Sequence, residues 1–181
     1  MSFKEIKIDE LKFNPTTLFG KDWCLATAGN KENGYNGMTI AWGQIGAVWD
    51  RKTEKGKIII PTLSVYVRPQ RYTKKYFDQE ELFTICAFDS QYKRALSYMG
   101  SHSGVKEDKI TNAGLTPLFI ENTTAYQEAK MIFVCKKIYH SPILENGFND
   151  PNIIIDNYPK KDFHEMYVGE IVKVFVADEK E

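Results

Sequence analysis

Apolar and polar residues alternate along several stretches of the chain, and the period changes between its ends and its middle. Over residues 37–49, GMTIAWGQIGAVW, large apolar residues alternate with small or hydroxyl ones, which predicts a β-strand. A second strand is predicted over residues 57–67, KIIIPTLSVYV. Pro61 lies inside it, and because proline cannot donate to the ladder, we expect a bulge or an edge position there.

The middle of the chain has helical spacing. Residues 72–81 predict a helix, and residues 82–88 return to a strand pattern. Ser90 is a candidate N-cap for a helix running to about Met99, and a shorter helix is predicted over residues 105–113. Helices are therefore expected between two groups of strands.

Strand patterns dominate again towards the C-terminus, over residues 117–121, 126–141 and 163–177. The coil-rich stretch 142–161 is a candidate functional loop, such as a lid, because long loops are uncommon in compact domains. Strands do not alternate with helices along the chain, which disfavours a parallel Rossmann sheet. No linker, repeat or low-complexity segment interrupts residues 1–181, so we expect one domain.

Composition and charge exclude several classes of function. The 181 residues are 43% hydrophobic and 27% charged, which is typical of one globular domain. Formal net charge is zero, so general attraction to nucleic acid or to an anionic membrane is not expected. No apolar run approaches the roughly 18 residues of a membrane span. We therefore predict no nucleic-acid partner and no membrane association.

The cysteines and the N-terminal sequence indicate the cellular compartment. The N-terminus, MSFKEIKIDE, has no apolar segment of a signal peptide. Cys24, Cys86 and Cys135 are odd in number, widely spaced and placed in apolar runs, which fits neither a metal site nor a disulfide framework. We expect buried, reduced thiols in a cytoplasmic protein, and no metal.

Basic residues gather near the end of a predicted strand. Residues 51–75 contain an excess of Lys and Arg, and within them the stretch 66–73, YVRPQRYT, places Arg68 and Arg71 where an apolar strand ends. A turn needs no arginines, so the segment is either a solvated turn or a site for an anion. Arg71 is the stronger candidate for binding the anion. Arg68 ranks below it, because Arg68 precedes Pro69 and a residue before proline is held extended, which would turn its side chain the other way.

Two further segments have groups that suit a phosphate, which needs charge-assisted donors. The first is the run Ser101–Gly104, with Lys109 following it, and the second is Thr39. The alternative is structural, because Ser103 and Thr73 are also typical helix caps. The backbone over residues 38–42 offers a different site, since its small residues allow a flat ligand to approach closely.

Four motifs occur together in this order: NGMTIAW, VYVRPQRYT, ALSYMGSHSG with a following DK, and EMYVGEI. Together they resemble the flavin reductase-like family of FMN-binding split β-barrel flavoproteins, which includes flavoredoxins. The match runs from about Trp23 to Val172. The resemblance implies a mainly β fold, an antiparallel Greek-key split β-barrel with a few short helices, assembled as a homodimer with one FMN near each subunit interface.

The resemblance also implies which residues bind the cofactor. The strand would lie along the edge of the FMN ring, and the other two segments would hold the phosphate. The residues so assigned are Met38, Thr39, Ile40, Ala41, Trp42, Arg68, Arg71, Tyr72, Thr73, Ser101, His102, Ser103, Gly104 and Lys109. His164 is a possible site residue facing the nicotinamide or the flavin, and no other catalytic residue is expected. Relatives often carry an arginine where this chain has Val105, so one phosphate donor is missing or replaced.

The resemblance implies an NAD(P)H-dependent flavin reductase, in which bound FMN accepts hydride and passes electrons to a small acceptor. The partners would then be NADH or NADPH and that acceptor. The first alternative is a non-enzymatic electron carrier reduced by a partner protein. The second is a module that binds a phosphorylated ligand through the same basic residues without FMN. No feature of the sequence separates a reductase from a carrier.

Overall fold

The computed structural model describes residues 2–178, and the ends of the predicted domain, residue 1 and residues 179–181, lie outside it. The strands are β1 (Phe3–Ile6), β2 (Cys24–Asn30), β3 (Gly34–Ile40), β4 (Gly43–Thr53), β5 (Gly56–Val67), β6 (Leu82–Ala87), β7 (Pro117–Ile120), β8 (Thr123–Tyr126), β9 (Met131–Pro142) and β10 (Glu165–Ala177). The helices are α1 (Pro15–Thr17), α2 (Thr73–Gln79), α3 (Lys93–Ser101), α4 (Lys109–Asn112) and α5 (Pro151–Asn157). Short 3₁₀ turns lie at Ile8–Glu10, Ser90–Tyr92 and Glu145–Gly147, and a π turn at Leu18–Asp22.

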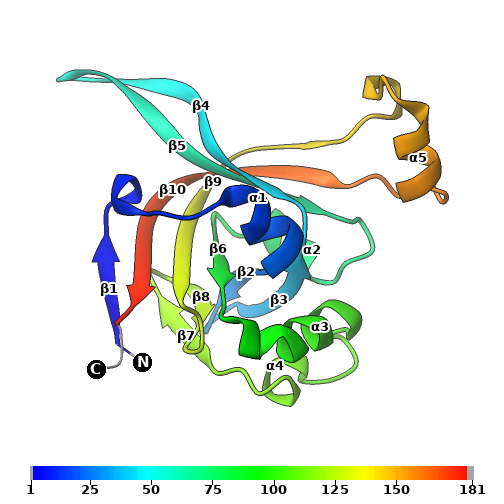
Figure 1. Ribbon diagram of the computed structural model, residues 1–181, viewed down its shortest axis with the longest axis horizontal. Coiled ribbons are helices and arrows are strands. Elements are labelled where there is room, and N and C mark those ends of the chain that lie inside the picture. The colour runs from blue at the N-terminus through cyan, green and yellow to red at the C-terminus, as the bar shows by residue number, and fades with distance from the viewer. Residues whose placement is uncertain (1, 179–181) are drawn as a thin grey trace.

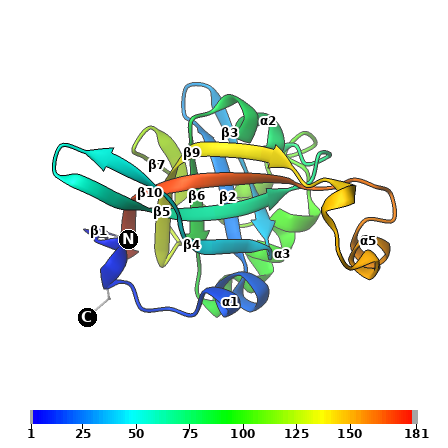
Figure 2. The same cartoon turned by 90° about the horizontal axis from the view of Figure 1, so that it is seen from above.

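One antiparallel sheet curls into a barrel (Figures 1 and 2). Its strand order is β3-β2-β6-β9-β10-β5-β4, with β1 paired to β10, while β7 and β8 form a separate two-stranded sheet. Within residues 2–178, the end strands β3 and β4 are not paired with each other, and the chain joins them through Ala41 and Trp42. This confirms the predicted mainly β, antiparallel split barrel.

The core consists of two layers that share strand β2. Cys24, Ala26 and Ala28 point into the barrel, whereas the alternate residue Leu25 packs in the second layer with the α3 residue Leu96. All seven residues of β2 are buried, because each side chain points into one layer or the other. Strands β6 and β9 alternate in the same way, so these three strands together join the barrel interior to the helical layer.

The three cysteines are buried and unpaired, as predicted. Burial raises the pKa of each thiol, which in Cys86 reaches about 12. Among the described residues no helix is long and apolar enough to cross a membrane.

Two predicted strands are each divided in the structure. The run 37–49 bends after Ile40, and β4 begins at Gly43, where an added Cβ would lie 2.5 Å from the Phe19 ring. The run 126–141 is interrupted by a turn, and the N–H of Lys130 donates to the carbonyl of Ala87 on β6. Apolar alternation continues across the first break, from Met38 through Ile40 to Trp42, so sequence alone did not reveal that bend.

The helix predictions were also wrong in detail. Ser90 lies in a 3₁₀ turn before α3 and is not its cap, and the helix predicted over 105–113 shortens to α4. The stretch predicted as coil, 142–161, contains α5, whose first turn is capped by the Asp150 side chain accepting from the Asn152 N–H. The predicted bulge is confirmed, because the pairing register shifts in β4 beside Pro61.

We predict that Gly169 is required for the close contact between β10 and the barrel interior. An added Cβ there would lie 2.6 Å from the Phe83 ring and 2.7 Å from Cβ of Cys135. Gly169→Ala should lower the free energy of unfolding by about 1–3 kcal/mol, because overpacking forces its neighbours to shift. Urea unfolding measures this change. Gly46→Ala is the control, since an added Cβ there meets nothing within 4 Å; equal stability of the two variants would contradict the packing argument.

Candidate functional site

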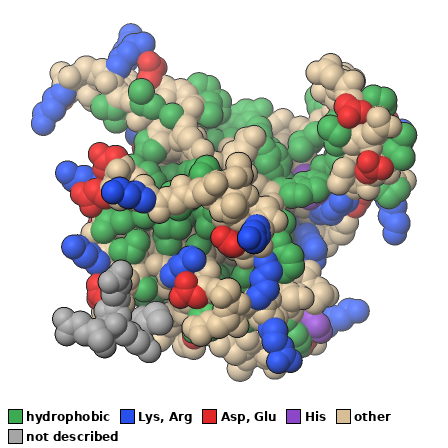
Figure 3. Space-filling model, in the orientation of Figure 1, with side chains coloured by type: hydrophobic (Ala, Val, Ile, Leu, Met, Phe, Trp, Pro, Cys, Tyr) green, Lys and Arg blue, Asp and Glu red, His purple; other side chains and the backbone are tan. Residues whose placement is uncertain are grey.

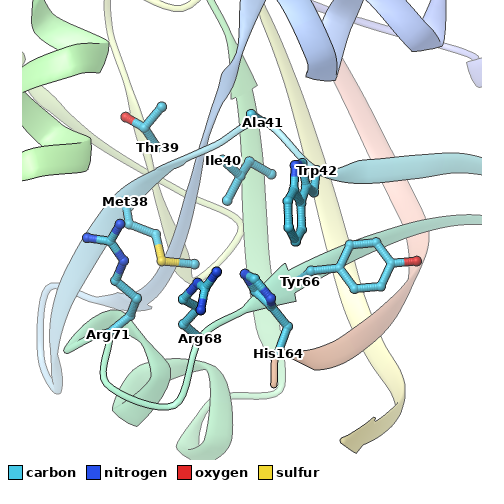
Figure 4. Close-up of a pocket in the computed structure, with 9 residues that line it drawn as sticks. All are labelled: Met38, Thr39, Ile40, Ala41, Trp42, Tyr66, Arg68, Arg71 and His164. Atoms are coloured by element: carbon cyan, nitrogen blue, oxygen red, sulfur yellow. The ribbon is translucent and has the colours of Figure 1, made fainter. Parts of the chain in front are cut away.

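Two adjoining pockets lie where the chain bends from β3 into β4. The first pocket has a volume of about 200 Å³, and the second about 100 Å³. The first is lined by Met38, Thr39, Ile40, Ala41, Trp42, Tyr66, Arg68, Arg71 and His164 (Figure 4). The second is lined by Asn36, Met38, Gln70, Arg71, Tyr72, Thr73, Ser101, His102, Ser103, Gly104 and Lys109. Met38 and Arg71 border both pockets, which therefore form one continuous site.

The structure brings every residue assigned to cofactor binding from the sequence to one of these pockets, together with His164. Their role in binding stays a prediction. Sequence reasoning missed Asn36, Tyr66 and Gln70. Asn36 was hidden because Asn-Gly is a strong turn signal, although here it lies within β3. Tyr66 and Gln70 lie within the stretch 66–73 itself, so that motif was the available signal.

One wall of the first pocket is the outer edge of β3. This strand pairs only with β2, so its outward backbone groups face no other strand of the sheet. Helix α3 braces the same edge, because the Thr39 hydroxyl donates to the carbonyl of Leu96. Gly100 allows this approach, since an added Cβ would lie 3.2 Å from Cβ of Thr39. The edge is thus rigidly held and offers backbone donors and acceptors.

Two cations border the second pocket, and both bind carbonyl groups at the end of α3. Lys109 is only 3% exposed, and its Nζ donates to the carbonyls of Met99 (2.9 Å) and His102 (3.2 Å). Arg71 donates from Nη1 to the carbonyl of Gly100 at 2.8 Å. The negative end of the helix dipole favours cations at this position.

The charge of these cations is not balanced by an acid in the pocket. Among its described lining residues none is Asp or Glu. Burial, and after it the nearby charge of Arg71, lowers the pKa of Lys109 to about 8. Lys109 has three N–H donors, of which two are used, and Arg71 has five, of which one is used. The second pocket is therefore suited to an anion.

Small and polar groups form the floor of the second pocket. Asn36 donates from Nδ2 to the Thr73 hydroxyl at 2.7 Å. An added Cβ at Gly104 would lie 2.4 Å from Oδ1 of Asn36, so this position accepts only glycine without a shift. Thr73 therefore contacts β3 and is not a helix cap, whereas the Ser103 hydroxyl accepts from the N–H of Val105 at 3.4 Å, as in a local turn.

Apart from Arg71, which it shares with the second pocket, the first pocket is close to neutral. Arg68 pairs with Asp162 at 2.5 Å and donates to the carbonyl of Asn157 at 2.8 Å, so its charge is balanced by the loop that precedes β10. Burial, and after it the charge of Arg68, lowers the pKa of His164 to about 4, which keeps its imidazole neutral at physiological pH. The ring of Trp42 lies 4.8 Å from that imidazole and covers this end of the pocket.

The remaining acidic and metal-binding possibilities are limited. Hydrogen bonds from Gln70 and Arg68 lower the pKa of Asp162, so this carboxylate stays ionised and paired. In the part of the chain that the structure describes, no cluster of His, Cys, Asp or Glu side chains could hold a metal ion. The site offers cations, hydroxyl groups, backbone groups and a neutral imidazole.

Comparison with known proteins identifies the fold. No family model and no curated protein matches the sequence. Among solved structures, the chain is similar to an FMN-binding domain of a flavin reductase-like enzyme from Shewanella baltica, at 14% identity and a TM-score of 0.64, covering 97% of this chain and 77% of that one. It is also similar to flavoredoxin of Desulfovibrio vulgaris, at 24% identity and a TM-score of 0.62, covering 86% and 69%.

A third similar structure is an NADH:FAD oxidoreductase of Streptomyces globisporus in complex with NAD and FAD fragments. Here identity is 14%, the TM-score is 0.58, and the coverage is 88% of this chain and 77% of that one. At these identities the likeness establishes the fold. The resemblance inferred from the four sequence motifs is thereby confirmed at the level of the split barrel.

We predict that anion binding depends on the protonation of Lys109. Its pKa of about 8 means that the side chain loses its charge between pH 7 and 9, whereas a bound anion would hold the proton. The affinity for inorganic phosphate should therefore fall by about tenfold over this range. Calorimetric titration of the wild type and of Lys109→Met measures it. The variant should bind more weakly at pH 7 and show little pH dependence; the same fall in both proteins would exclude Lys109 as the cause.

Proposed function

We propose that the protein is an FMN-binding flavoprotein that acts as an NAD(P)H-dependent flavin reductase. The observation that carries this proposal is that a pocket beside the outer edge of β3, close to neutral apart from the shared Arg71, joins a cationic pocket. FMN has the matching pair of parts, a flat uncharged ring and a phosphate dianion. The proteins that share the fold include ones described as FMN-binding, which supports the same cofactor here.

The residues present fit FMN. The backbone of residues 38–42 would meet the polar edge of the ring, and Trp42 would cover part of it. Arg71 and Lys109 would hold the phosphate, with the hydroxyl groups of Thr73 and Ser103 beside them. The Val105 side chain has no donor, and Arg71 and Lys109 are the two cations that line the pocket.

When bound, FMN supplies the two-electron chemistry, accepting hydride from NADH or NADPH and passing electrons to a small acceptor. The chain's own residues would bind and orient the reactants. His164 is neutral and part-covered by Trp42, so it suits a hydrogen bond better than proton transfer at neutral pH. No acid–base residue is required by this chemistry.

We predict that Arg71 contacts the phosphate and not the ring. One charge-assisted hydrogen bond contributes about 1.5–3 kcal/mol, so Arg71→Ala should weaken FMN affinity by about ten- to a hundredfold. Riboflavin lacks the phosphate, and its affinity should barely change. Fluorescence titration with both flavins measures the difference.

The matched control is Arg94→Ala, because Arg94 is an exposed arginine on α3 outside both pockets. It should bind both flavins like the wild type. Equal losses for FMN and riboflavin in Arg71→Ala would end the phosphate assignment. Failure of the wild type to bind any FMN would leave the alternative of a module for another phosphorylated ligand.

The second candidate function is an electron carrier, and the likeness to flavoredoxin favours it. We predict that, without oxygen, NADH or NADPH bleaches the absorbance of the FMN-loaded protein at a rate that supports turnover. Stopped-flow mixing with each nucleotide measures this rate. If neither nucleotide bleaches the flavin while a reduced protein donor does, the protein is a carrier.

We also propose a homodimer, because exposed apolar residues gather on two projecting arms. On the β4–β5 hairpin, Trp49 is 53% exposed and Ile59 72%, and on the α5 arm Ile155 is 68% exposed. Figures 1 and 3 show both arms projecting from the same side of the barrel, with apolar side chains on and between them. Such a surface is typical of an interface between subunits.

We predict that light scattering gives twice the 20.9 kDa monomer mass at micromolar concentration. Ile59→Lys should shift the population towards the monomer, because it places a charge in the apolar surface. Val105→Lys is the control, since Val105 is also apolar, is 66% exposed and belongs to the loop between α3 and α4, outside both arms. A monomeric wild type with FMN bound would contradict the proposal.

A further inference from the structure

A buried tyrosine contacts the histidine of the first pocket. Tyr158 is 3% exposed and His164 is 8% exposed, and the Tyr158 hydroxyl lies 2.9 Å from Nδ1 of His164. Tyr158 was not assigned a role from the sequence. It lies at the end of α5, so the arm and the pocket meet at this contact.

The surroundings of Tyr158 fix its ring in place. The Phe163 ring lies 4.7 Å from it, the Phe148 ring 5.8 Å, and the Arg68 guanidinium 5.3 Å over its face. Arg68 is itself held by Asp162 and by the carbonyl that ends α5. The hydroxyl therefore has little freedom to turn away from His164.

The hydrogen-bond pattern determines which way the shared proton points. Burial raises the pKa of Tyr158, so its hydroxyl keeps its proton. Among the described residues, Nδ1 of His164 is the one hydrogen-bond partner of this buried hydroxyl. If Nδ1 carried a proton, the Tyr158 O–H would be buried without an acceptor, so the O–H donates to Nδ1. A neutral imidazole that accepts at Nδ1 must carry its proton on Nε2.

We propose that Tyr158 holds His164 in the neutral Nε2–H tautomer, and that this N–H is the donor that the first pocket offers to a carbonyl oxygen of its substrate. The second half rests on the proposed function, whereas the first does not. Tyr158 is thus a positioning residue. Figure 4 shows the imidazole projecting into the pocket between Arg68 and Tyr66, towards Ile40 and Trp42.

The charged groups around the imidazole are consistent with this assignment. Arg68 and Arg71 both oppose an imidazolium, and Asp162, which would favour one, is paired with Arg68. The Trp42 ring lies against the imidazole, at 4.8 Å and tilted by 46°, which restricts its rotation. A neutral N–H donor held by two neighbours is suited to an uncharged acceptor such as an aldehyde, ketone or amide carbonyl.

The first test is the tautomer itself, which needs no cofactor. Two-bond ¹H–¹⁵N correlation spectra of histidine-labelled protein distinguish the two ring nitrogens. We expect the wild type to show Nε2–H, with the pKa of His164 near 4. In Tyr158→Phe the ratio of the Nδ1–H to the Nε2–H tautomer should rise by about tenfold, because one hydrogen bond is lost, and the pKa of His164 should rise.

Tyr66→Phe is the matched control. Tyr66 lines the same pocket, but its hydroxyl contacts Gln44 at 3.2 Å and not His164. This variant should keep the wild-type tautomer and the wild-type pKa of His164. If Tyr158→Phe also keeps both, or if the wild type already shows Nδ1–H, the positioning role of Tyr158 is wrong.

The second test addresses the carbonyl. FMN-loaded protein is titrated with p-hydroxybenzaldehyde and with p-cresol, which has the same ring and hydroxyl but no carbonyl. The His164 Nε2–H resonance should move downfield with the aldehyde alone, and Tyr158→Phe should weaken aldehyde binding several-fold while leaving p-cresol unchanged. Equal shifts with both probes, or none at saturating aldehyde, would overturn the carbonyl assignment. Because the tautomer is measured without flavin, a failure of FMN binding would be seen separately.

Discussion

The site depends on the open side of the barrel, between the end strands β3 and β4. Within residues 2–178, no hydrogen bonds join β3 to β4, and only the bend through Ala41 and Trp42 closes that side. If β3 and β4 were paired, their hydrogen bonds would use the backbone groups on the outer edge of β3, and none of these groups would remain for a ligand. The bend instead leaves this edge beside the first pocket, while α3 holds it in place through Thr39. Fold and binding surface thus have one structural cause.

The second constraint is the burial of Lys109 beside Arg71. Burying a cation costs free energy unless partners replace its water. The carbonyl groups at the end of α3 replace part of the water around Lys109. The pKa of Lys109, lowered to about 8, indicates that they do not replace all of it. A dianion in the second pocket would complete the compensation. The same arrangement therefore suits the second pocket to an anion.

Much of this arrangement follows from the sequence, because strand periodicity and the four motifs are local signals. Residues 57–67 and 82–88 were predicted as strands and match β5 and β6 closely. The bend after Ile40 was missed, because apolar alternation continues across it and the contact that causes it is distant in sequence. Tyr158 was missed because its role depends on the packing of a loop that has no periodic pattern. The bend goes with a contact between distant segments, whereas Tyr158 contacts mainly residues near it in the chain, such as Phe163 and His164.

The different charge of the two pockets also determines how a ligand can lie in the site. A ligand with a dianion at one end places it beside Arg71 and Lys109, since the opposite orientation would bring it to the ionised Asp162 and leave Lys109 uncompensated. The uncharged end must then lie along β3, next to Trp42 and His164. This orientation is the same for a reductase and for a carrier. What distinguishes the two functions is the partner that reaches the uncharged end, where Trp42 and His164 line the first pocket.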